Sequence, residues 1–351
     1  MTGTGSTCRW GVIGTAGIAR KVVRAMHLAR HASPVAIASR NLDRALVFAD
    51  DHGLERAHGS YEAMLADPEI DAVYVPLPTG VRREVVIAAA RAGKHVLSEK
   101  PVAPHAGAAE EMIEACTDAG VQFMDGVMFM HHRRMDIVRE HLSAIGPVPK
   151  LMHSAFTFMA DPTFMESNIR ASVDTEPLGC VGDLGWYNIR MALIAMQDLP
   201  RVVRARHHRI HAGVPMHTSG ELEFDGPDGS RIAHFQCSFI HPLRQWVEIV
   251  GDEGCLRMQD FVIGSPTEAE IEVETESGLT EGDAAHRWNR ERIAVRNCVQ
   301  EAEMIECFSR IATGSDPIDP QWPRWAMDTQ KVTDAVMSSA SADGASIQLV
   351  R

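Results

Sequence analysis

The stretch that decides the fold reads RWGVIGTAGIAR and spans residues 9–20. Its first half is an apolar strand pattern that runs directly into Gly14-Thr15-Ala16-Gly17-Ile18, and a helical pattern follows at once. A strand, a glycine turn and a helix in this order are typical of a turn that binds the phosphates of a dinucleotide. Gly14 supplies the tight turn, and the helix N-terminus offers N–H groups and a partial positive charge to an anion.

Alanine stands at positions 16 and 19, where the usual pattern has its second and third glycines. Because alanine is small, the backbone at Ala16 can still approach a pyrophosphate. The alternative is a glycine-rich turn that holds no ligand. The strand and helix patterns that follow this turn favour the dinucleotide.

Apolar strand patterns alternate with helical patterns through the first third of the chain, which predicts a parallel sheet covered on both faces. The expected strands are Arg9–Ile13, Pro34–Ser39, Asp71–Val75, His95–Ser98 and Val121–Met124, with a sixth at Arg56–His58. Asn41 is placed to cap a helix that begins at Leu42. These patterns predict an α/β Rossmann domain, a doubly wound parallel sheet, over residues 1–126.

The alternation ends near residue 126, and long strands joined by turns dominate Lys150–Met258. One helix interrupts them at Gly182–Met196, and two more are expected at Asn297–Thr313 and Trp325–Ala340. Glu268–His286 is polar enough to form a loop. Residues 127–351 are therefore expected to form an α+β domain with a large open antiparallel sheet, which binds substrate and joins subunits.

The second expected strand ends in Ser39-Arg40, where a site specific for NAD would carry an acidic residue for the ribose diol. A hydroxyl and a guanidinium suit a 2′-phosphate instead. The sequence thus favours NADP(H), with NAD(H) still open. The alternative is that Arg40 is a solvated loop residue.

Ligands of open α/β sheets bind outside the carboxyl ends of the strands, so residues just after each strand are the best site candidates. Pro76-Leu77-Pro78-Thr79 forms a rigid turn that is expected to wall the cofactor. Glu99-Lys100-Pro101 follows the next strand, and the proline restricts the backbone at Lys100 to extended forms. Lys100 is therefore expected at a fixed place in the cleft.

Composition excludes several other classes of function. The net charge is -13, whereas binding to a nucleic acid backbone needs clustered Lys and Arg. The longest apolar runs reach about six residues, far below the roughly 18 of a membrane span. The seven cysteines are scattered and the 17 histidines are dispersed. We expect no nucleic acid, membrane or metal partner, reduced thiols, and a cytoplasmic location.

Residues 93–101, Gly-Lys-His-Val-Leu-Ser-Glu-Lys-Pro, stand behind the Gly14 and Pro76 turns and closely resemble the Gfo/Idh/MocA oxidoreductases. The family is named for glucose–fructose oxidoreductase, inositol dehydrogenase and a rhizopine-catabolism protein. Residues 182–187, Gly-Asp-Leu-Gly-Trp-Tyr, are similar to the family's Asp-x-Gly-x-Tyr segment. The resemblance covers essentially the whole chain and implies a Rossmann domain followed by an open sheet that commonly pairs with another subunit.

The resemblance also implies roles for single residues. Glu99 would lie near the nicotinamide ribose, Lys100 would contact the reacting oxygen, and Tyr187 would take the acid/base position. Tyrosine there is similar to the branch with glucose–fructose oxidoreductase, dimeric dihydrodiol dehydrogenase and some xylose dehydrogenases. The sequence departs from the family at Arg82, where a histidine is common, and before Asp183, where the glycine-rich stretch is reduced.

The chemistry of the residues agrees with these roles. A phenol with a pKa of about 10 is a weak base unless a cation stabilises its anion, and Lys100 supplies one. The same ammonium stabilises a developing alkoxide. Asp183 and Tyr187 are four residues apart on an expected helix, so Asp183 is placed to orient the substrate or Lys100. The alternatives are an aromatic that packs beside Trp186 and an acid that favours the helix dipole.

Four further residues are weaker candidates for substrate binding. Asn168 and Arg170 lie in a polar loop before Asp183, where a loop salt bridge is the alternative. His132 follows the domain junction, and Trp186 adjoins Tyr187. His131 and His132 are neighbours, so only one of them can face a site.

These observations predict an NAD(P)-dependent oxidoreductase that prefers NADP(H) and acts on a sugar, polyol or cyclic diol. Two alternatives stay open. One is an enzyme that uses a tightly held nicotinamide transiently during sugar elimination or glycoside cleavage, and the other is a non-catalytic sensor of the dinucleotide. A homodimer or homotetramer through the C-terminal sheet is expected.

Overall fold

The computed structural model describes residues 6–161, 163–227, 229–276 and 288–349. It divides into two compact units. The first comprises Met1–His131 and Val299–Gln330, and the second comprises His132–Cys298 and Lys331–Arg351. Helix α10 (Gln321–Ser341) therefore gives residues to both. No helix in the described part of the chain is long and apolar enough to cross a membrane.

The first unit is built on a parallel sheet with the strand order β3-β2-β1-β4-β5-β6. The short sixth strand expected at Arg56–His58 is confirmed. The order reverses between β1 and β4, and all carboxyl ends meet at one edge, where ligands of such sheets bind. The strands are β1 (Cys8–Ile13), β2 (Ala32–Ala38), β3 (Arg56–His58), β4 (Ala72–Val75), β5 (His95–Ser98) and β6 (Phe123–Asp125).

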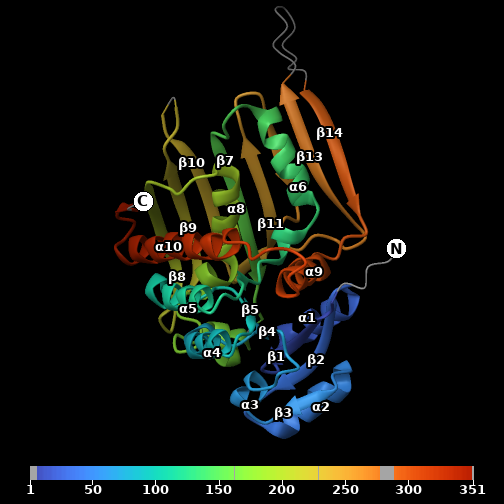
Figure 1. The fold of residues 1–351 in the computed structure, drawn as a ribbon. Helices are drawn as coiled ribbons and strands as arrows, with labels where there is room; N and C mark the ends of the chain where they lie inside the picture. Colours follow the sequence, from blue (N-terminus) through green and yellow to red (C-terminus); the bar gives the residue numbers. More distant parts are fainter. Residues whose placement is uncertain (1–5, 162, 228, 277–287, 350–351) are drawn as a thin grey trace, which may run out of the picture. The chain divides into compact units, whose positions relative to one another are not determined.

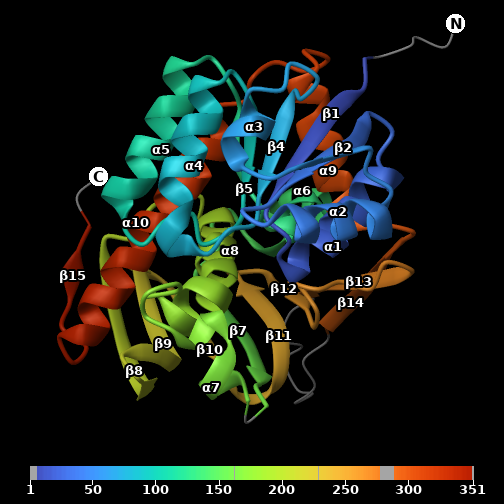
Figure 2. The same cartoon turned by 90° about the horizontal axis from the view of Figure 1, so that it is seen from below.

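Helices cover both faces of this sheet, with α4 and α5 on one side and α1 and α2 on the other (Figure 2). The predicted cap of α2 is confirmed, because the Asn41 side chain accepts a hydrogen bond from the Arg44 N–H at 3.0 Å. The elements are α1 (Gly17–Leu28), α2 (Leu42–His52), α3 (Tyr61–Leu65), α4 (Thr79–Arg91), α5 (Ala106–Asp118), α9 (Gln300–Ala312) and the 3₁₀ turn Met128–His131.

The compact units differ from the predicted division at residue 126, because α9 packs on the first sheet. The Trp10 side chain is fully buried, and its indole N–H donates to the Ser309 hydroxyl at 2.9 Å. Its ring lies 5.0 Å from that of Phe308. A buried indole needs both a partner for its N–H and apolar cover, and α9 supplies both. As functional domains, residues 1–126 and 127–351 stay a prediction.

The second unit is built on a sheet of nine strands among the described residues, in the order β14-β13-β12-β11-β7-β10-β9-β8-β15. Its pairs are antiparallel, as predicted, except that β7 and β10 are parallel, since α8 and the β8–β9 hairpin lie between them in the chain. The strands are β7 (Leu151–Met159), β8 (Val202–His211), β9 (Val214–Phe224), β10 (Arg231–Ser238), β11 (Ile240–Val250), β12 (Gly254–Met258), β13 (Glu268–Glu276), β14 (Trp288–Arg296) and β15 (Ile347–Gln348).

The loop predicted at Glu268–His286 is wrong over its first nine residues, which form β13. Alternating glutamates made this stretch look polar, yet Ala269, Ile271 and Val273 are buried on one face of the sheet. Strict alternation of this kind is the pattern of a half-buried strand. The rest of the predicted loop, from residue 277, lies outside the described residues.

Helices α6 and α8 lie on the same face of the large sheet (Figure 1). The Asn188 amide of α8 donates to the Ser154 hydroxyl of β7 at 2.9 Å. Ser154 therefore points to the helical face, and His153, the residue before it, points to the other face. The remaining elements are α6 (Arg134–His141), α7 (Phe164–Ser167), α8 (Trp186–Met196), a π-helical turn (Val181–Gly185) and the 3₁₀ turns Leu142–Ile145 and Ile169–Ala171.

The face that bears His153 carries a row of six charged residues and two histidines, one from each of eight neighbouring strands. Residues directly opposite each other on paired strands share a face. In the middle of the row the rings of His153 and His234 stack, with centroids 5.1 Å apart. We call this row the charge ladder. It consists of Arg204, Glu221, His234, His153, Glu248, Arg257, Glu272 and Arg292.

Candidate active site

The turn after β1 has the shape that a dinucleotide phosphate requires. Gly14 adopts a φ of 95°, and a Cβ atom there would lie 3.0 Å from the Leu77 side chain. Any larger residue would be strained and would fill the cradle. Ala16 caps α1 without a side-chain hydrogen bond. The residues predicted to hold the cofactor, Gly14 to Ile18, thus lie at the edge where the strands end, and their shape fits the group.

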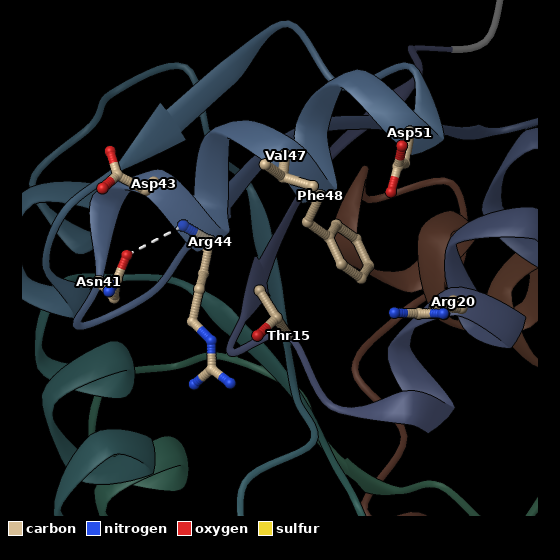
Figure 3. Close-up of a pocket in the computed structure, with 8 residues that line it drawn as sticks. All are labelled: Thr15, Arg20, Asn41, Asp43, Arg44, Val47, Phe48 and Asp51. Carbon is tan, nitrogen blue, oxygen red and sulfur yellow. Dashed lines mark hydrogen bonds between the residues drawn. The ribbon is translucent and has the colours of Figure 1, made fainter.

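A cavity of about 380 Å³ opens beside this turn (Figure 3). The Arg44 side chain, from the first turn of α2, extends toward Thr15 there. Of the two residues predicted for a 2′-phosphate, Ser39 is buried and its hydroxyl accepts from the Asn41 N–H at 3.2 Å, while Arg40 is exposed. The lining residues are Thr15, Arg20, Asn41, Asp43, Arg44, Val47, Phe48 and Asp51.

Sequence reasoning overlooked Arg44. The sequence feature that could have identified it is the helix cap at Asn41, which fixes the first turn of α2 next to the end of β2. A basic residue three positions after such a cap lies one turn into the helix, on the side of the cap. The cavity therefore has a cation that the strand-end pattern alone does not identify.

The loop after β4 also lies where it was predicted. Pro76 and Leu77 are buried, Pro78 caps α4, and Thr79 is the first residue of that helix. Thr79 is 1% exposed. The turn is therefore packed in place beside the Gly14 cradle, as a wall for a cofactor would be.

The segment that bears Lys100 is held on its strand side by a buried acid. The Tyr74 hydroxyl of β4 donates to one carboxylate oxygen of Glu99 at 2.5 Å, and the Lys100 N–H donates to the other at 3.1 Å. Gly126 lies so close that a Cβ atom there would be 3.1 Å from the same Glu99 carboxylate. The Lys100–Pro101 peptide bond is cis. Tyr74 was also overlooked, because a tyrosine inside an apolar strand pattern is indistinguishable from a core residue.

In the second unit, Arg170 lies near two of the predicted site residues, Asp183 and Tyr187. Its guanidinium forms an ion pair with Asp183 at 3.1 Å. The Arg170 pKa is raised, chiefly by the charge of Asp183 and to a lesser extent by Glu176 and by Tyr187. Asp183 and Tyr187 therefore both lie near one cation, and the salt bridge considered as an alternative for Arg170 is present.

The helix predicted over Gly182–Met196 begins differently from the prediction. Val181–Gly185 forms a π-helical turn, and α8 continues from Trp186. Such turns are wider than α-helical ones and are frequent at functional sites. The Tyr187 ring packs edge-on against Phe156, with centroids 5.4 Å apart. The packing considered as an alternative for Tyr187 is thus also observed, although its partner is Phe156.

The other predicted substrate residues make local contacts. The Asn168 side-chain oxygen, Oδ1, accepts from the Arg170 N–H at 3.0 Å and so caps a short helical turn. His132 is 2% exposed, and its Nδ1 accepts from the Arg134 N–H at 3.1 Å. Trp186 is fully buried. Asn168 and His132 thus have local structural contacts, and the contact of all three residues with substrate stays a prediction.

Lys100 belongs to the first unit and Tyr187 to the second. That the Lys100 ammonium and the Tyr187 hydroxyl meet at the nicotinamide stays a prediction. Among the residues that the structure describes, no group of three or more His, Cys, Asp or Glu side chains is arranged to hold a metal ion.

A doubly wound sheet with a glycine cradle after β1 and a held lysine after β5, joined to a unit with a large mixed sheet, defines a class of Rossmann-fold oxidoreductases. Two family models match this chain. Residues 8–127 match the oxidoreductase family with an NAD-binding Rossmann fold, and residues 144–257 match the GFO/IDH/MocA C-terminal domain. The chain belongs to the Gfo/Idh/MocA family of oxidoreductases, as the sequence motifs predicted.

Named relatives align over most of their length. D-xylose 1-dehydrogenase (NADP(+)) 2 of Haloferax volcanii is 33% identical, over 97% of this chain and 99% of its own. Trans-1,2-dihydrobenzene-1,2-diol dehydrogenase of Xenopus laevis is 30% identical, over 74% and 77%. A 3-ketoreductase from Actinomadura kijaniata, solved with NADP and TDP-benzene, superposes with a TM-score of 0.81 at 27% identity, over 95% of this chain and 98% of its own.

The hydrogen bond between Tyr74 and Glu99 gives a first prediction. Tyr74→Phe keeps the ring but leaves a buried carboxylate oxygen without this donor. We expect the free energy of unfolding to fall by about 1–3 kcal/mol. Urea unfolding followed by circular dichroism measures it, and Tyr61→Phe, at a half-buried tyrosine, is the matched control. Equal stability of the Tyr74→Phe variant and the wild type would contradict the assigned hydrogen bond.

Proposed function

We propose that this chain transfers a hydride between NADP(H) and a secondary alcohol or carbonyl group of a sugar, polyol or cyclic diol. The observation that carries the proposal is the placement of Lys100. It follows β5 at the carboxyl edge of the parallel sheet, next to a glutamate that Tyr74 holds in place. A lysine whose backbone is held at this edge has no evident use in a protein that only senses a dinucleotide.

The preference for NADP over NAD rests on charge at the end of β2. No acidic residue stands there to bind a ribose diol, while Arg40 is exposed and Arg44 lines the cavity beside Thr15. Two guanidinium groups near one phosphate are a strong electrostatic match. The names of the xylose dehydrogenase and the structure of the ketoreductase each include NADP, which supports the same choice.

We assign the proton chemistry to residues of both units. The nicotinamide, when bound, accepts or donates the hydride. Tyr187 would exchange a proton with the substrate oxygen, and Lys100 would stabilise the negative charge that develops on that oxygen. Arg170, which lies near Tyr187 and Asp183, would favour the phenolate further. Asp183 would limit this effect, because its carboxylate offsets part of the guanidinium charge.

The substrate class is inferred from the relatives. Their names include a D-xylose dehydrogenase, a dihydrobenzene-diol dehydrogenase and a 3-ketoreductase. All three describe the interconversion of a carbon-bound hydroxyl and a carbonyl group. A cytoplasmic location stays a prediction, in keeping with the seven free thiols, and cell fractionation would test it.

The cofactor assignment predicts a selective loss of affinity. Arg40→Ala and Arg44→Ala should each raise the Kd for NADP by about 10- to 100-fold, because a hydrogen bond to a charged group contributes about 1.5–3 kcal/mol. The Kd for NAD should change little. Quenching of tryptophan fluorescence measures both constants, with Arg24→Ala, on the exposed face of α1, as control. If both variants keep the wild-type ratio of the two constants, the assignment is wrong.

The chemical assignment is tested with aldoses, inositols and trans-diols, with NADP⁺ and absorbance of the reduced cofactor as the readout. Lys100→Met and Tyr187→Phe should each lower turnover of an accepted substrate about 100-fold or more and leave NADP affinity largely intact. Lys331→Met, at an exposed position of α10, controls for the loss of a lysine. Unchanged turnover removes the residue from the mechanism. A nicotinamide that co-purifies without net turnover supports the transient use of a held cofactor.

We also propose that two or four copies associate through the face of the large sheet that bears the charge ladder. Its outer ion pairs are already formed within one chain, with Arg204–Glu221 at 3.0 Å and Arg257–Glu248 at 2.6 Å. Internally paired charges can be buried against a second copy at a smaller desolvation cost than single ones. His153 and His234 stack at the centre of the ladder, between these two ion pairs.

This arrangement predicts assembly that depends on pH. Burial, and then the neighbouring His234, lower the pKa of His153, so its ring is neutral near pH 7. Protonation of His153, at a pH below the ordinary histidine value of about 6.5, would place a positive charge in the stack and weaken association. Light scattering should show fewer copies at the lower pH, and a His153→Gln, His234→Gln variant should remove the change. A monomer at neutral pH would contradict the proposal.

A further inference from the structure

Arg82 is a buried arginine in α4 that has no part in the proton chemistry proposed for Lys100 and Tyr187. It is 2% exposed, and arginine is rarely buried to this extent unless its charge and donors are satisfied. Its guanidinium donates to the Leu77 carbonyl oxygen through two nitrogens, at 3.0 and 2.5 Å. The third nitrogen donates to the carbonyl oxygens of Glu99, Pro101 and Val102, the last at 3.3 Å.

These carbonyl groups belong to two loops that are separated in the chain by α4 but follow neighbouring strands of the sheet. Leu77 lies in the loop after β4, and the other three lie in the loop after β5. Glu99 and Pro101 are the residues on either side of Lys100. A single planar cation therefore ties the turn beside the Gly14 cradle to the backbone on both sides of the proposed catalytic lysine.

The arginine side chain bonds to both loops at once, which a lysine side chain at this position cannot do. Arginine presents five donors in a rigid fork, whereas the lysine ammonium is a compact group on a flexible stem. Only the fork spans carbonyl oxygens on two loops at once. With Glu99 held by Tyr74 on the other side, the backbone at Lys100 is fixed from two directions.

The next residue of the same helix shows how different the surroundings are. Arg83 forms an ion pair with Glu111, and the two side chains are 41% and 50% exposed. Ion pairs of that kind contribute little to stability. Arg83 is therefore a matched control for a change of charge on α4 that leaves the Lys100 loop untouched.

We infer that Arg82 is a positioning residue for Lys100, whose guanidinium fixes the loop after β5 so that the ammonium reaches the reacting oxygen. The inference rests on the proposed role of Lys100. It adds that the chain needs arginine at position 82 for the rate of the reaction. A displacement of about 1 Å in a catalytic group can lower the rate about 100-fold.

A double-mutant cycle tests this inference. Arg82→Lys and Arg82→Met are each combined with wild-type Lys100 and with Lys100→Ala, and kcat, KM and the Kd for NADP are measured with an accepted substrate. With Lys100 present, the Arg82 variants should lower kcat by about 10- to 100-fold, with Arg82→Met the more severe. Because Arg82 also holds Leu77 in the turn beside the cofactor cradle, the Kd for NADP is measured separately, and the loss of kcat at saturating NADP should exceed any change in that constant. With Lys100→Ala, the same changes should have little further effect on kcat, because there is no ammonium left to position.

The outcomes separate a positioning role from a general structural one. An equal reduction of kcat in both backgrounds, or an unchanged kcat with Lys100 present, overturns the inference. Arg83→Met should leave kcat unchanged in both. If Arg82→Met does not fold, Arg82→Lys carries the cycle, since it keeps a cation at the buried position. Full turnover by Lys100→Ala alone would overturn the proposed function instead, and so the two failures are distinguishable.

Discussion

Hydrogen bonds from buried side chains to the loops after β4 and β5 are the constraint on which the rest of the proposed site depends. A parallel sheet brings its strand ends to one edge, but the loops beyond that edge have no ladder of backbone hydrogen bonds to hold them. In this chain, buried side chains replace the ladder. Tyr74 holds the Glu99 side chain at 2.5 Å, and Arg82 binds carbonyl oxygens of both loops. The position of Lys100 follows from these contacts more than from its own side chain.

Burial of the Glu99 carboxylate and the Arg82 guanidinium carries a large desolvation cost, which explains why many hydrogen bonds converge on these two groups. A charged group taken out of water without partners is destabilising by several kcal/mol. Glu99 is 7% exposed and Arg82 is 2% exposed. The Glu99 carboxylate accepts two hydrogen bonds, and Arg82 donates to four carbonyl oxygens. Together these bonds hold the edge of the sheet rigid where a catalytic group must be fixed. Rigidity of this kind is what lets electrostatic stabilisation act without reorganisation.

Much of the fold could be predicted from the sequence, because strand periodicity and helix caps are local. The six parallel strands and the cap at Asn41 follow from patterns a few residues long. The packing of α9 on the first sheet could not, because Trp10 and Ser309 are 299 residues apart. The same limit applies to the site. The strand-end rule identifies Lys100, whereas the support given by Tyr74 and Arg82 depends on contacts between loops that the sequence does not reveal.

The second unit shows how a local irregularity can gather residues that an ideal helix would not. The π-helical turn Val181–Gly185 precedes α8, and Asp183 within it pairs with Arg170 from the loop before. Tyr187, in the first turn of α8, is close enough to influence the same guanidinium. A wider turn changes the direction of every side chain that it carries, so spacing alone cannot say where Asp183 points. The ion pair with Asp183 orients the same guanidinium that lies near Tyr187, so the π-helical turn and the start of α8 are linked through Arg170. The predicted contact of Asp183 with a substrate stays a prediction.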